Sequence, residues 1–413
     1  MKVLVLNSGS SSLKFQLFTL DSLDNDKCQL LASGLIEQIG ETQSSSQIEF
    51  RNEQQLLENV KQTSIISDHQ QALELMTKLL KSSHCLSSMT ELAAIGHRVV
   101  HGGEYFSDPV LINDQVIETI DRLSPLAPLH NPANLTGIKL AKLKAPLVPQ
   151  VAVFDTSFHQ SIPKFAYIYA LPYSLYEKNK VRRYGFHGTS HYYIAKQATA
   201  YLNGKHQNSA ELKLISIHLG NGTSACAILN GQSIDTSMGM TPLEGLVMGT
   251  RSGDIDPAIL FYLNRETGMS FEELDILFNK QSGLKGICGT NDMRSIVELA
   301  EQGDSKAELA IHIFCYRIKK YIGAYMAALN GLDAIIFTGG IGEHSSIIRA
   351  LSCQNLENLG IQVDATKNNI SSKNITEIQS NASPVKILVI PTNEELEIAK
   401  QTITIIRGWL TRC

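Results

Sequence analysis

Two apolar segments flank a short polar turn near the N-terminus. Residues 3–6 (VLVL) form an unbroken apolar run, which is the pattern of a strand buried on both faces. After the turn NSGSSS, apolar residues at 13, 15 and 17 alternate with Lys14 and Gln16, which favours a half-buried strand. The two strands are predicted to pair as a hairpin.

The turn of this hairpin has the composition of an anion site. Its small residues can present N–H groups and hydroxyls to a ligand, most often a phosphate, and Lys14 adds a charge at the rim. A serine-rich turn without any ligand is the alternative at this point. The turn is not a P-loop, because the pattern GxxxxGK[ST] is absent.

The pattern recurs about half a chain later. LKLISIHLGNGTSACAIL (212–229) again reads strand, small polar turn, strand, and aligning Gly9 with Gly222 places Phe15 on Ile228. A third turn, in DAIIFTGGIGEHS (333–345), follows a buried-type strand and precedes a predicted helix over 346–360, so its backbone donors lie at a helix N-terminus. The repeat predicts two duplicated α/β domains that face one nucleotide.

Prolines around the apolar run VAVF, between residues 144 and 163, mark the predicted domain boundary. The expected domains are 1–155 and 156–391, and the C-terminal segment 392–413 is expected to form a helix that packs back on the first domain, with acidic residues in its first turn. Residues 41–55 are expected to be an exposed loop and strand edge, and residues 366–384 another surface segment.

Composition and charge restrict the function classes. The 413 residues are 43% hydrophobic and 18% charged with a net charge of −4, which predicts a globular protein without nucleic-acid or membrane partners. No apolar run reaches about 18 residues, and the N-terminus enters a strand at once, so neither a membrane span nor a signal peptide is expected. Seven scattered cysteines without a CxxC pair favour reduced thiols in a cytoplasmic protein and no zinc site.

Two charged residues lie in or beside apolar strands. Arg98, in GHRVVHGG, needs an anionic partner, which is either a carboxylate of the protein or one of a ligand. Asp155 ends the apolar run VAVF, and α/β proteins place their sites at the carboxyl ends of strands. The alternative for Asp155 is a turn aspartate that caps the next segment.

Two further segments carry polar chemistry. His187 and His191 in GFHGTSH have the i, i+4 spacing of a metal pair, but the sequence between them favours a turn entering a helix, with Thr189 or Ser190 as N-cap. A histidine that donates to a phosphate or carboxylate is therefore favoured.

Arg251 lies in a glycine-flanked loop, where it is either solvated or open to close approach by a ligand. Clustered cations beside phosphate-type turns point to phosphoryl transfer, which depends on positioning and charge neutralisation.

Ten ordered segments, which cover essentially the whole chain, resemble the acetate kinase family: VLNSGSSSLKFQLF, GHRVVHGG, PLHNP, VFDTSFH, GFHGTSH, HLGNG, MGTRSGD, NDMR, GGIGE and PTNEE. The resemblance implies a duplicated actin-like, ribonuclease-H-like α/β fold with two domains around a nucleotide cleft. It also implies a cytoplasmic homodimeric phosphotransferase. This enzyme would reversibly transfer the γ-phosphoryl of ATP to acetate by direct in-line transfer, giving acetyl phosphate and ADP, with Mg²⁺ or alternatively Mn²⁺.

The resemblance also assigns roles to matching residues. Asp155, His187 and Arg251 would be catalytic; Asp155 would act in acid–base chemistry or, as we prefer, orient the site, because acetate is already ionised at pH 7. The metal-linked residues would be Asn7 and Glu394, with Glu395 as the alternative to Glu394. The substrate-binding residues would be Arg98, on the acetate carboxylate, with Val100, Leu129, His130, Phe186 and Pro242. The nucleotide-binding residues would be Lys14, His218, Leu219, Gly220, Asn221, Gly222, Asp292, Met293, Arg294, Gly340, Ile341, Gly342, Glu343 and His344.

One departure and two competing interpretations accompany this assignment. The family commonly has GIGEN where this chain has GIGEH, so the contact made by His344 is open. An acyl kinase that prefers propionate would share every motif. A non-catalytic actin-like nucleotide sensor or assembly protein would explain the phosphate-type turns, but not the presence of Arg98, His187 and Arg251 beside them.

Overall fold

The computed structural model describes residues 1–413 except 21–27, 52–55, 206–210, 371–372 and 412–413. The described residues form two units, one of residues 1–157 with 393–413 and one of residues 158–392. Among them, no helix has both the length and the apolar character that a membrane crossing requires.

The first unit is built on a mixed sheet whose strands follow the order β5-β4-β3-β2-β1-β6-β8-β7. Its strands are β1 Lys2–Ser8, β2 Ser12–Leu20, β3 Cys28–Glu37, β4 Ser44–Arg51, β5 Leu57–Ser64, β6 Leu92–Val99, β7 Val110–Leu111 and β8 Gln150–Phe154. Its helices are α1 His69–Ser82, α2 Asp114–Arg122, α3 Asn131–Lys144 and α15 Glu394–Leu410.

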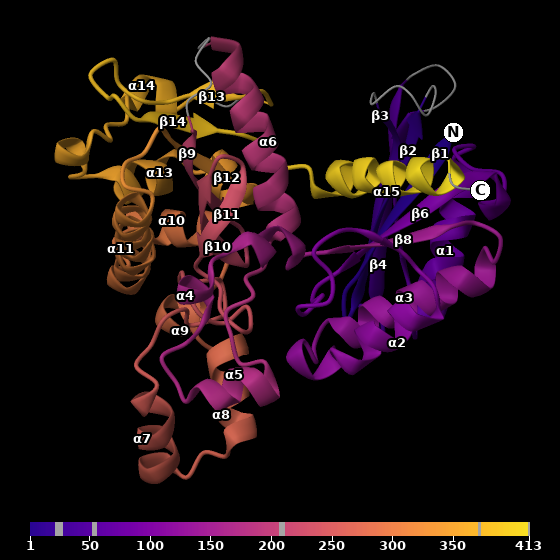
Figure 1. The fold of residues 1–413 in the computed structure, drawn as a ribbon, viewed down its shortest axis with the longest axis horizontal. Coiled ribbons are helices and arrows are strands. Elements are labelled where there is room, and N and C mark those ends of the chain that lie inside the picture. The colour runs from indigo at the N-terminus through magenta and orange to yellow at the C-terminus, as the bar shows by residue number, and fades with distance from the viewer. Residues whose placement is uncertain (21–27, 52–55, 206–210, 371–372, 412–413) are drawn as a thin grey trace. The chain divides into compact units, whose positions relative to one another are not determined.

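The predicted N-terminal hairpin is confirmed. Strands β1 and β2 pair antiparallel, with Leu6 opposite Phe15. Side chains of β1 alternate between the faces of the sheet: Leu4 and Leu6 pack with residues of α1 and α3, whereas Val3 and Val5 pack with residues of α15. Figure 1 shows α15, in yellow, crossing the face formed by β1, β6 and β8. The unbroken apolar run therefore reflects helices on both faces.

For residues 41–55, the expected exposed loop is present at residues 41–43, whereas the expected strand edge was wrong. Strand β4 lies inside the sheet, between β3 and β5, and the exposed edge strand is β5. The polar residues of β4 concealed an alternation in which Ile48 and Phe50 are buried. Residues 52–55 of this expectation, and residues 371–372 of the predicted surface segment 366–384, lie outside the described residues.

The second unit has a sheet of order β11-β10-β9-β12-β14-β13. Its strands are β9 Lys213–Leu219, β10 Thr223–Leu229, β11 Gln232–Thr236, β12 Ala334–Thr338, β13 Thr376–Glu377 and β14 Lys386–Val389. Its helices are α4 Lys164–Tyr167, α5 Tyr173–Asn179, α6 Gly188–Lys205, α7 Ala258–Thr267, α8 Phe271–Lys280, α9 Gly283–Cys288, α10 Met293–Glu301, α11 Ser305–Ala328, α12 Gly339–His344, α13 Ser346–Cys353 and α14 Ala365–Asn368.

The two sheets repeat one topology, which confirms the duplicated α/β fold. The series β3-β2-β1-β6-β8 and β11-β10-β9-β12-β14 have the same order, and corresponding pairs share the same direction. The predicted alignment fails only in the second strand of the repeat. In the first hairpin Leu6 pairs with Phe15, so the alignment predicts that Leu219 pairs with Ile228. Leu219 instead pairs with Thr223, and Ile228 with Leu214, because the turn 220–222 is shorter than that of the first hairpin.

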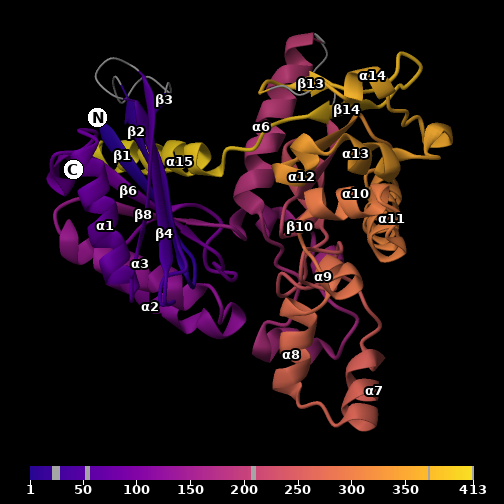
Figure 2. The ribbon, with the colours of Figure 1, turned by 180° about the vertical axis from the view of Figure 1, so that it is seen from behind.

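Helices cover both faces of the second sheet. Residues of α10, α11 and α13 pack on one face and residues of α6 on the other (Figure 2). The third predicted turn is confirmed as the junction of β12 with α12, whose first residue, Gly339, has φ 75°. The helix predicted over 346–360 is shorter than expected and ends at Cys353; Gly360, at φ 77°, ends a short 3-10 turn.

Close packing in the first unit gives a stability prediction. Gly34 of β3 lies over the ring of Phe15, and a Cβ at this position would overlap that ring. We expect Gly34→Ala to lower the free energy of unfolding by about 1–3 kcal/mol, as overpacked cores do. Urea unfolding followed by circular dichroism measures this. The matched control is Gly408→Ala in α15, where nothing lies within 4 Å and Ala favours the helix. Equal stability of the two variants would contradict the prediction.

Candidate active site

Polar side chains gather at one edge of the first sheet. Strands β1, β6 and β8 are adjacent and parallel, so their carboxyl ends meet at the same edge. Asn7 lies near the end of β1, Arg98 near the end of β6, and Asp155 directly after β8. Glu394, the first residue of α15, completes the group, which we call the strand-end site.

Arg98 is the centre of the strand-end site. Its Nη2 donates to Asp155 Oδ2 at 2.8 Å, and its Nη1 donates to Asn7 Oδ1 at 3.4 Å. Its Nε lies 3.9 Å from Glu394 Oε2. The Asp155 carboxylate is fully buried, so its charge is balanced by this guanidinium. Of the two partners considered for Arg98, a carboxylate of the protein is therefore present, and an additional ligand contact stays a prediction.

The two glutamates at the start of α15 differ in their surroundings. Lys14 Nζ lies 2.6 Å from Glu395 Oε1, and Glu395 is 7% exposed; the contact of Lys14 with nucleotide phosphates stays a prediction. Burial, reinforced by the nearby charge of Asp155, raises the pKa of Glu394 to about 7, although Arg98 favours its ionised form. Because Glu395 is engaged by Lys14, Glu394 is the better placed of the two to accept a metal ion.

The oxygen donors of the strand-end site fit a magnesium ion that is shared with a ligand. The described residues contain no group of three or more His, Cys, Asp or Glu side chains spaced to hold a metal ion. Mg²⁺ typically uses one or two carboxylates and takes its remaining ligands from water and phosphate oxygens. Asn7, Asp155 and Glu394 supply such hard oxygen donors, so the donor set is compatible with Mg²⁺ and with Mn²⁺.

The predicted substrate-binding residues other than Arg98 are divided between the units. Val100 is buried in the first unit, and its N–H donates to Asn134 Oδ1 at 3.0 Å. Leu129 is exposed, and His130 directly precedes α3. Phe186 and Pro242 belong to the second unit, where Phe186 is buried. Their contact with the substrate stays a prediction.

In the second unit, His187 directly precedes α6 and has φ 56°, in the left-handed region that non-glycine residues seldom adopt. The prediction of Thr189 or Ser190 as N-cap was wrong, because α6 begins at Gly188 and both residues lie in its first turn. The Ser190 hydroxyl instead bonds His218 Nδ1 at 2.8 Å.

His187 and His191 do not form a metal pair. Both ring nitrogens of His191 are hydrogen bonded to serine hydroxyls, Nδ1 to Ser216 at 2.9 Å and Nε2 to Ser224 at 2.8 Å. His187 Nδ1 bonds the same Ser224 hydroxyl at 2.9 Å. The preference for a histidine that donates to an anion over a metal ligand is consistent with this geometry.

Two cationic or donor groups meet at the turn 220–222. A Cβ placed on Gly222 would lie 2.8 Å from Arg251 Nη2 and 3.1 Å from His187 Nε2, so only glycine leaves room for both. Arg251 Nη1 donates to Pro242 O at 2.6 Å, and no carboxylate in the described part of the chain pairs with this guanidinium. Burial lowers the pKa of Arg251 to about 10, which leaves it charged at pH 7. A partly buried cation without a carboxylate partner is typical of an anion-binding site.

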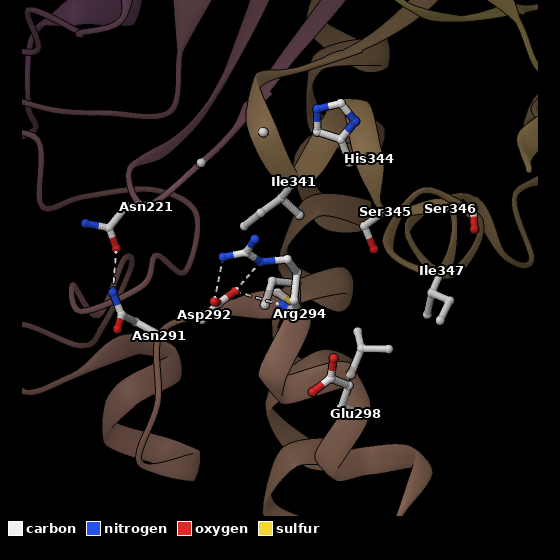
Figure 3. A pocket seen from close by; sticks show the side chains of 14 residues that line it. Asn221, Asn291, Asp292, Arg294, Glu298, Ile341, His344, Ser345, Ser346 and Ile347 are labelled. Carbon is white, nitrogen blue, oxygen red and sulfur yellow. Dashed lines mark hydrogen bonds and ion pairs between the residues drawn. The ribbon is translucent and has the colours of Figure 1, made fainter. Parts of the chain in front are cut away.

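A cavity of about 700 Å³ lies beside this turn (Figure 3). Figure 3 shows Asn221 and Asn291 on one side and Ser345, Ser346 and Ile347 on the other, with Arg294 between them. Of the predicted nucleotide-binding residues, those that line it are Gly220, Asn221, Asp292, Met293, Arg294, Gly340, Ile341 and His344. Sequence reasoning assigned no role to Asn291, although it is the first residue of NDMR. It also missed Val297 and Glu298, about one helical turn beyond NDMR, and Ser345, Ser346 and Ile347, which follow shortly after GGIGE.

The other predicted nucleotide-binding residues do not line this cavity. The Leu219 side chain is buried in the core of the second unit. The Glu343 carboxylate accepts hydrogen bonds from Gly339 N at 3.0 Å and Thr392 N at 3.1 Å, so it links the first residue of α12 to the backbone that follows β14. His218 Nδ1 contacts Ser190, as described above; Gly222 lies in the turn 220–222, and Gly342 lies in α12.

Comparisons with known proteins agree with this geometry. Residues 2–400 match the family model described as Acetokinase family. The chain is 53% identical to an acetate kinase of Sulfurovum sp., with 98% of this chain and 99% of the relative covered, and 52% identical to an acetate kinase of Campylobacter lari, with 99% and 100% covered. Among solved structures, a Francisella tularensis propionate kinase (45% identity) and a Porphyromonas gingivalis acetate kinase (42%) each have a TM-score of 0.89, with 98% of this chain and 99% of theirs covered. The chain belongs to the acetokinase family.

Proposed function

We propose that this protein is a phosphotransferase with a carboxyl group as acceptor. It transfers the γ-phosphoryl group of ATP to acetate, reversibly, and forms acetyl phosphate and ADP by direct in-line transfer. The observation that carries this proposal is Arg251, a cation without a carboxylate partner in the described residues, which approaches Gly222 together with His187. Donors arranged in advance around one point stabilise the charge of a migrating phosphoryl group.

Arg98 is the proposed ligand of the acetate carboxylate. Its pairing with Asp155 holds the planar guanidinium in a fixed orientation, which suits the recognition of a second carboxylate. Asp155 orients this group and does not need to remove a proton, because acetate is ionised at pH 7. The acceptor oxygen is therefore already nucleophilic, and positioning supplies most of the catalysis.

The strand-end site is the proposed metal-binding site. Glu394 and Asn7 would hold the divalent ion, with Asp155 close by. When bound, Mg²⁺ neutralises charge on phosphate oxygens. Hard carboxylate and amide oxygens suit both Mg²⁺ and Mn²⁺, and the family resemblance makes Mg²⁺ our first choice.

The pKa of Glu394 makes metal affinity dependent on pH. Because burial raises this pKa to about 7, the carboxylate is largely ionised at pH 8 and largely protonated at pH 6. We expect the Mg²⁺ affinity of the ATP complex to fall by about tenfold between pH 8 and pH 6, since one pH unit below the pKa leaves about a tenth of the group ionised. Calorimetric titration with Mg²⁺ measures this.

Two variants separate the candidate ligands. Glu394→Gln should bind Mg²⁺ weakly at both pH values and lose most of the pH dependence. Glu395→Gln should keep both the Mg²⁺ affinity and its pH dependence, because Glu395 forms an ion pair with Lys14. The reverse pattern would assign the metal to Glu395.

Acetate is our proposed substrate, and propionate is the second candidate. The curated relatives are named acetate kinase, whereas one of the two solved structures with a TM-score of 0.89 is a propionate kinase. One methylene group in an apolar pocket is worth only about 1–3 kcal/mol, so both acids are reasonable substrates.

Trapping of acyl phosphate with hydroxylamine tests the function. The purified protein receives ATP and Mg²⁺ with acetate, propionate or butyrate in parallel. The highest kcat/KM for acetate supports the proposal, and a preference for propionate keeps the mechanism but changes the substrate. If nucleotide binds but no acyl phosphate forms, the chain is a nucleotide sensor rather than a kinase.

We also propose a cytoplasmic homodimer with domains 1–155 and 156–391, the segment 392–413 belonging to the first domain. The family resemblance supports the dimer, and the separate sheets of the two units support the division. Light scattering of the purified protein at micromolar concentration tests the dimer, and a monomer mass would contradict it.

A further inference from the structure

A continuous chain of hydrogen bonds leads from the core of the second unit to His187. Ser216 Oγ on β9 bonds His191 Nδ1, His191 Nε2 bonds Ser224 Oγ on β10, and Ser224 Oγ bonds His187 Nδ1. The three distances lie between 2.8 and 2.9 Å. Ser216, His191 and Ser224 are all fully buried, so water does not compete for these bonds.

The direction of this series of hydrogen bonds follows from the bond that Ser216 makes in the core. A serine hydroxyl has one hydrogen to donate, and a buried donor without an acceptor destabilises the folded state. In the described part of the chain, the hydrogen-bond partner of Ser216 Oγ is His191 Nδ1. Ser216 therefore donates its hydrogen to His191, and Nδ1 is the acceptor.

This first bond determines the remaining ones. Burial lowers the pKa of His191 well below its ordinary value, so the ring is neutral and carries one hydrogen. With Nδ1 as acceptor, that hydrogen lies on Nε2 and is donated to Ser224. Ser224 then has its own hydrogen left to donate to His187 Nδ1. The opposite direction would leave the Ser216 hydroxyl hydrogen buried without an acceptor.

We propose that Ser216, His191 and Ser224 are positioning residues that keep His187 in the tautomer with its hydrogen on Nε2. Nε2 is the atom that approaches Gly222 beside Arg251. The chain thus presents an N–H donor, rather than a lone pair, at the point where a phosphoryl oxygen would lie. The inference rests on the proposed function for its catalytic meaning, whereas the direction of the hydrogen bonds does not depend on it.

Kinetics of Ser224 variants test the catalytic part. We expect Ser224→Ala to lower kcat about tenfold with both KM values changed less than twofold, and Ser224→Thr, which retains a hydroxyl, to recover most of kcat. The matched control is Ser237→Ala, which removes a buried serine whose hydroxyl accepts from Ala225 N at 2.9 Å. If Ser224→Ala leaves kcat unchanged, or if Ser237→Ala lowers it equally, the positioning role is wrong.

Nitrogen NMR of ring-labelled histidine tests the direction of the hydrogen bonds. His187 is assigned by comparison with His187→Gln. We expect its Nε2 to be protonated and its Nδ1 to have the shift of a hydrogen-bonded acceptor, which Ser224→Ala should abolish. If Ser224→Ala does not fold, Ser216→Ala should weaken the same signature with about threefold lower kcat. A proton on Nδ1 of wild-type His187 overturns the proposal. Absence of kinase activity with the expected tautomer would instead refute the proposed function, and the proposed direction of the hydrogen bonds would stand.

Discussion

Arg251→Ala should lower kcat by about 10³-fold and leave the KM values for acetate and ATP within about threefold. A single arginine that neutralises a migrating phosphoryl group is worth about 10³–10⁵ in rate. The guanidinium has no carboxylate partner in the described residues, so its charge is available to a ligand, and a pKa of about 10 keeps it charged throughout the neutral range. Steady-state kinetics of acyl phosphate formation measure the effect.

Two controls give this result its meaning. Arg251→Lys keeps the charge but loses the planar fork, so it should fall between the wild type and the alanine variant. Arg317→Ala removes an arginine of the same unit that lies 3.2 Å from Asp254, and it should leave kcat unchanged. Unchanged turnover in Arg251→Ala would exclude Arg251 from the transition state. An equal loss in Arg317→Ala would indicate damage to the whole unit.

Arg98→Ala should raise the acetate KM by about 10- to 150-fold while the ATP KM changes little. This range corresponds to the roughly 1.5–3 kcal/mol of a hydrogen bond to a charged group. The side chain is held by Asp155 and Asn7, so its orientation exists before the substrate arrives. The removal of Arg98 also leaves the buried Asp155 without its counter-charge, so the variant should unfold at a lower urea concentration.

The interpretation of Arg98 depends on which substrate is affected. Arg98→Lys should recover part of the acetate affinity. Arg122→Ala, in which an exposed arginine over the ring of Tyr105 is removed, is the matched control and should leave both KM values unchanged. If the KM values for acetate and ATP rise equally in Arg98→Ala, the arginine does not bind the acetate carboxylate.

Local patterns allowed the fold to be predicted where burial follows the periodicity of the sequence. The runs 3–6 and 214–219 predicted strands because side chains alternate between two faces, and both faces are covered by helices. The same reasoning failed for β4, where serines and glutamine fill a strand inside the sheet. Strand propensity is a weak signal there, because pairing with β3 and β5 determines the conformation.

Motifs located most of the candidate site but not the role of each side chain. Residues of the segments NDMR and GGIGE line the cavity, and their contacts with a nucleotide stay a prediction. Within the second segment, however, Glu343 turns to its own backbone and to Thr392. Lys14 likewise pairs with Glu395, far away in the sequence. A motif identifies which residues lie near a turn, whereas the direction of each side chain depends on neighbours from other segments.

The sequence by itself determined the repeated strand–turn–strand units, the family and the residue types at the site, because these properties follow from local periodicity and from ordered motifs. Only the tertiary structure decided the electrostatics. Arg98 and Asp155 meet because parallel β6 and β8 end at one edge of the sheet. Burial of Glu394 beside them raises the pKa of its carboxyl group. The direction of the hydrogen bonds that reach His187 depends on burial of Ser216 on a strand nearly thirty residues away. Interactions of this kind depend on distances in space, which the order of residues along the chain does not contain.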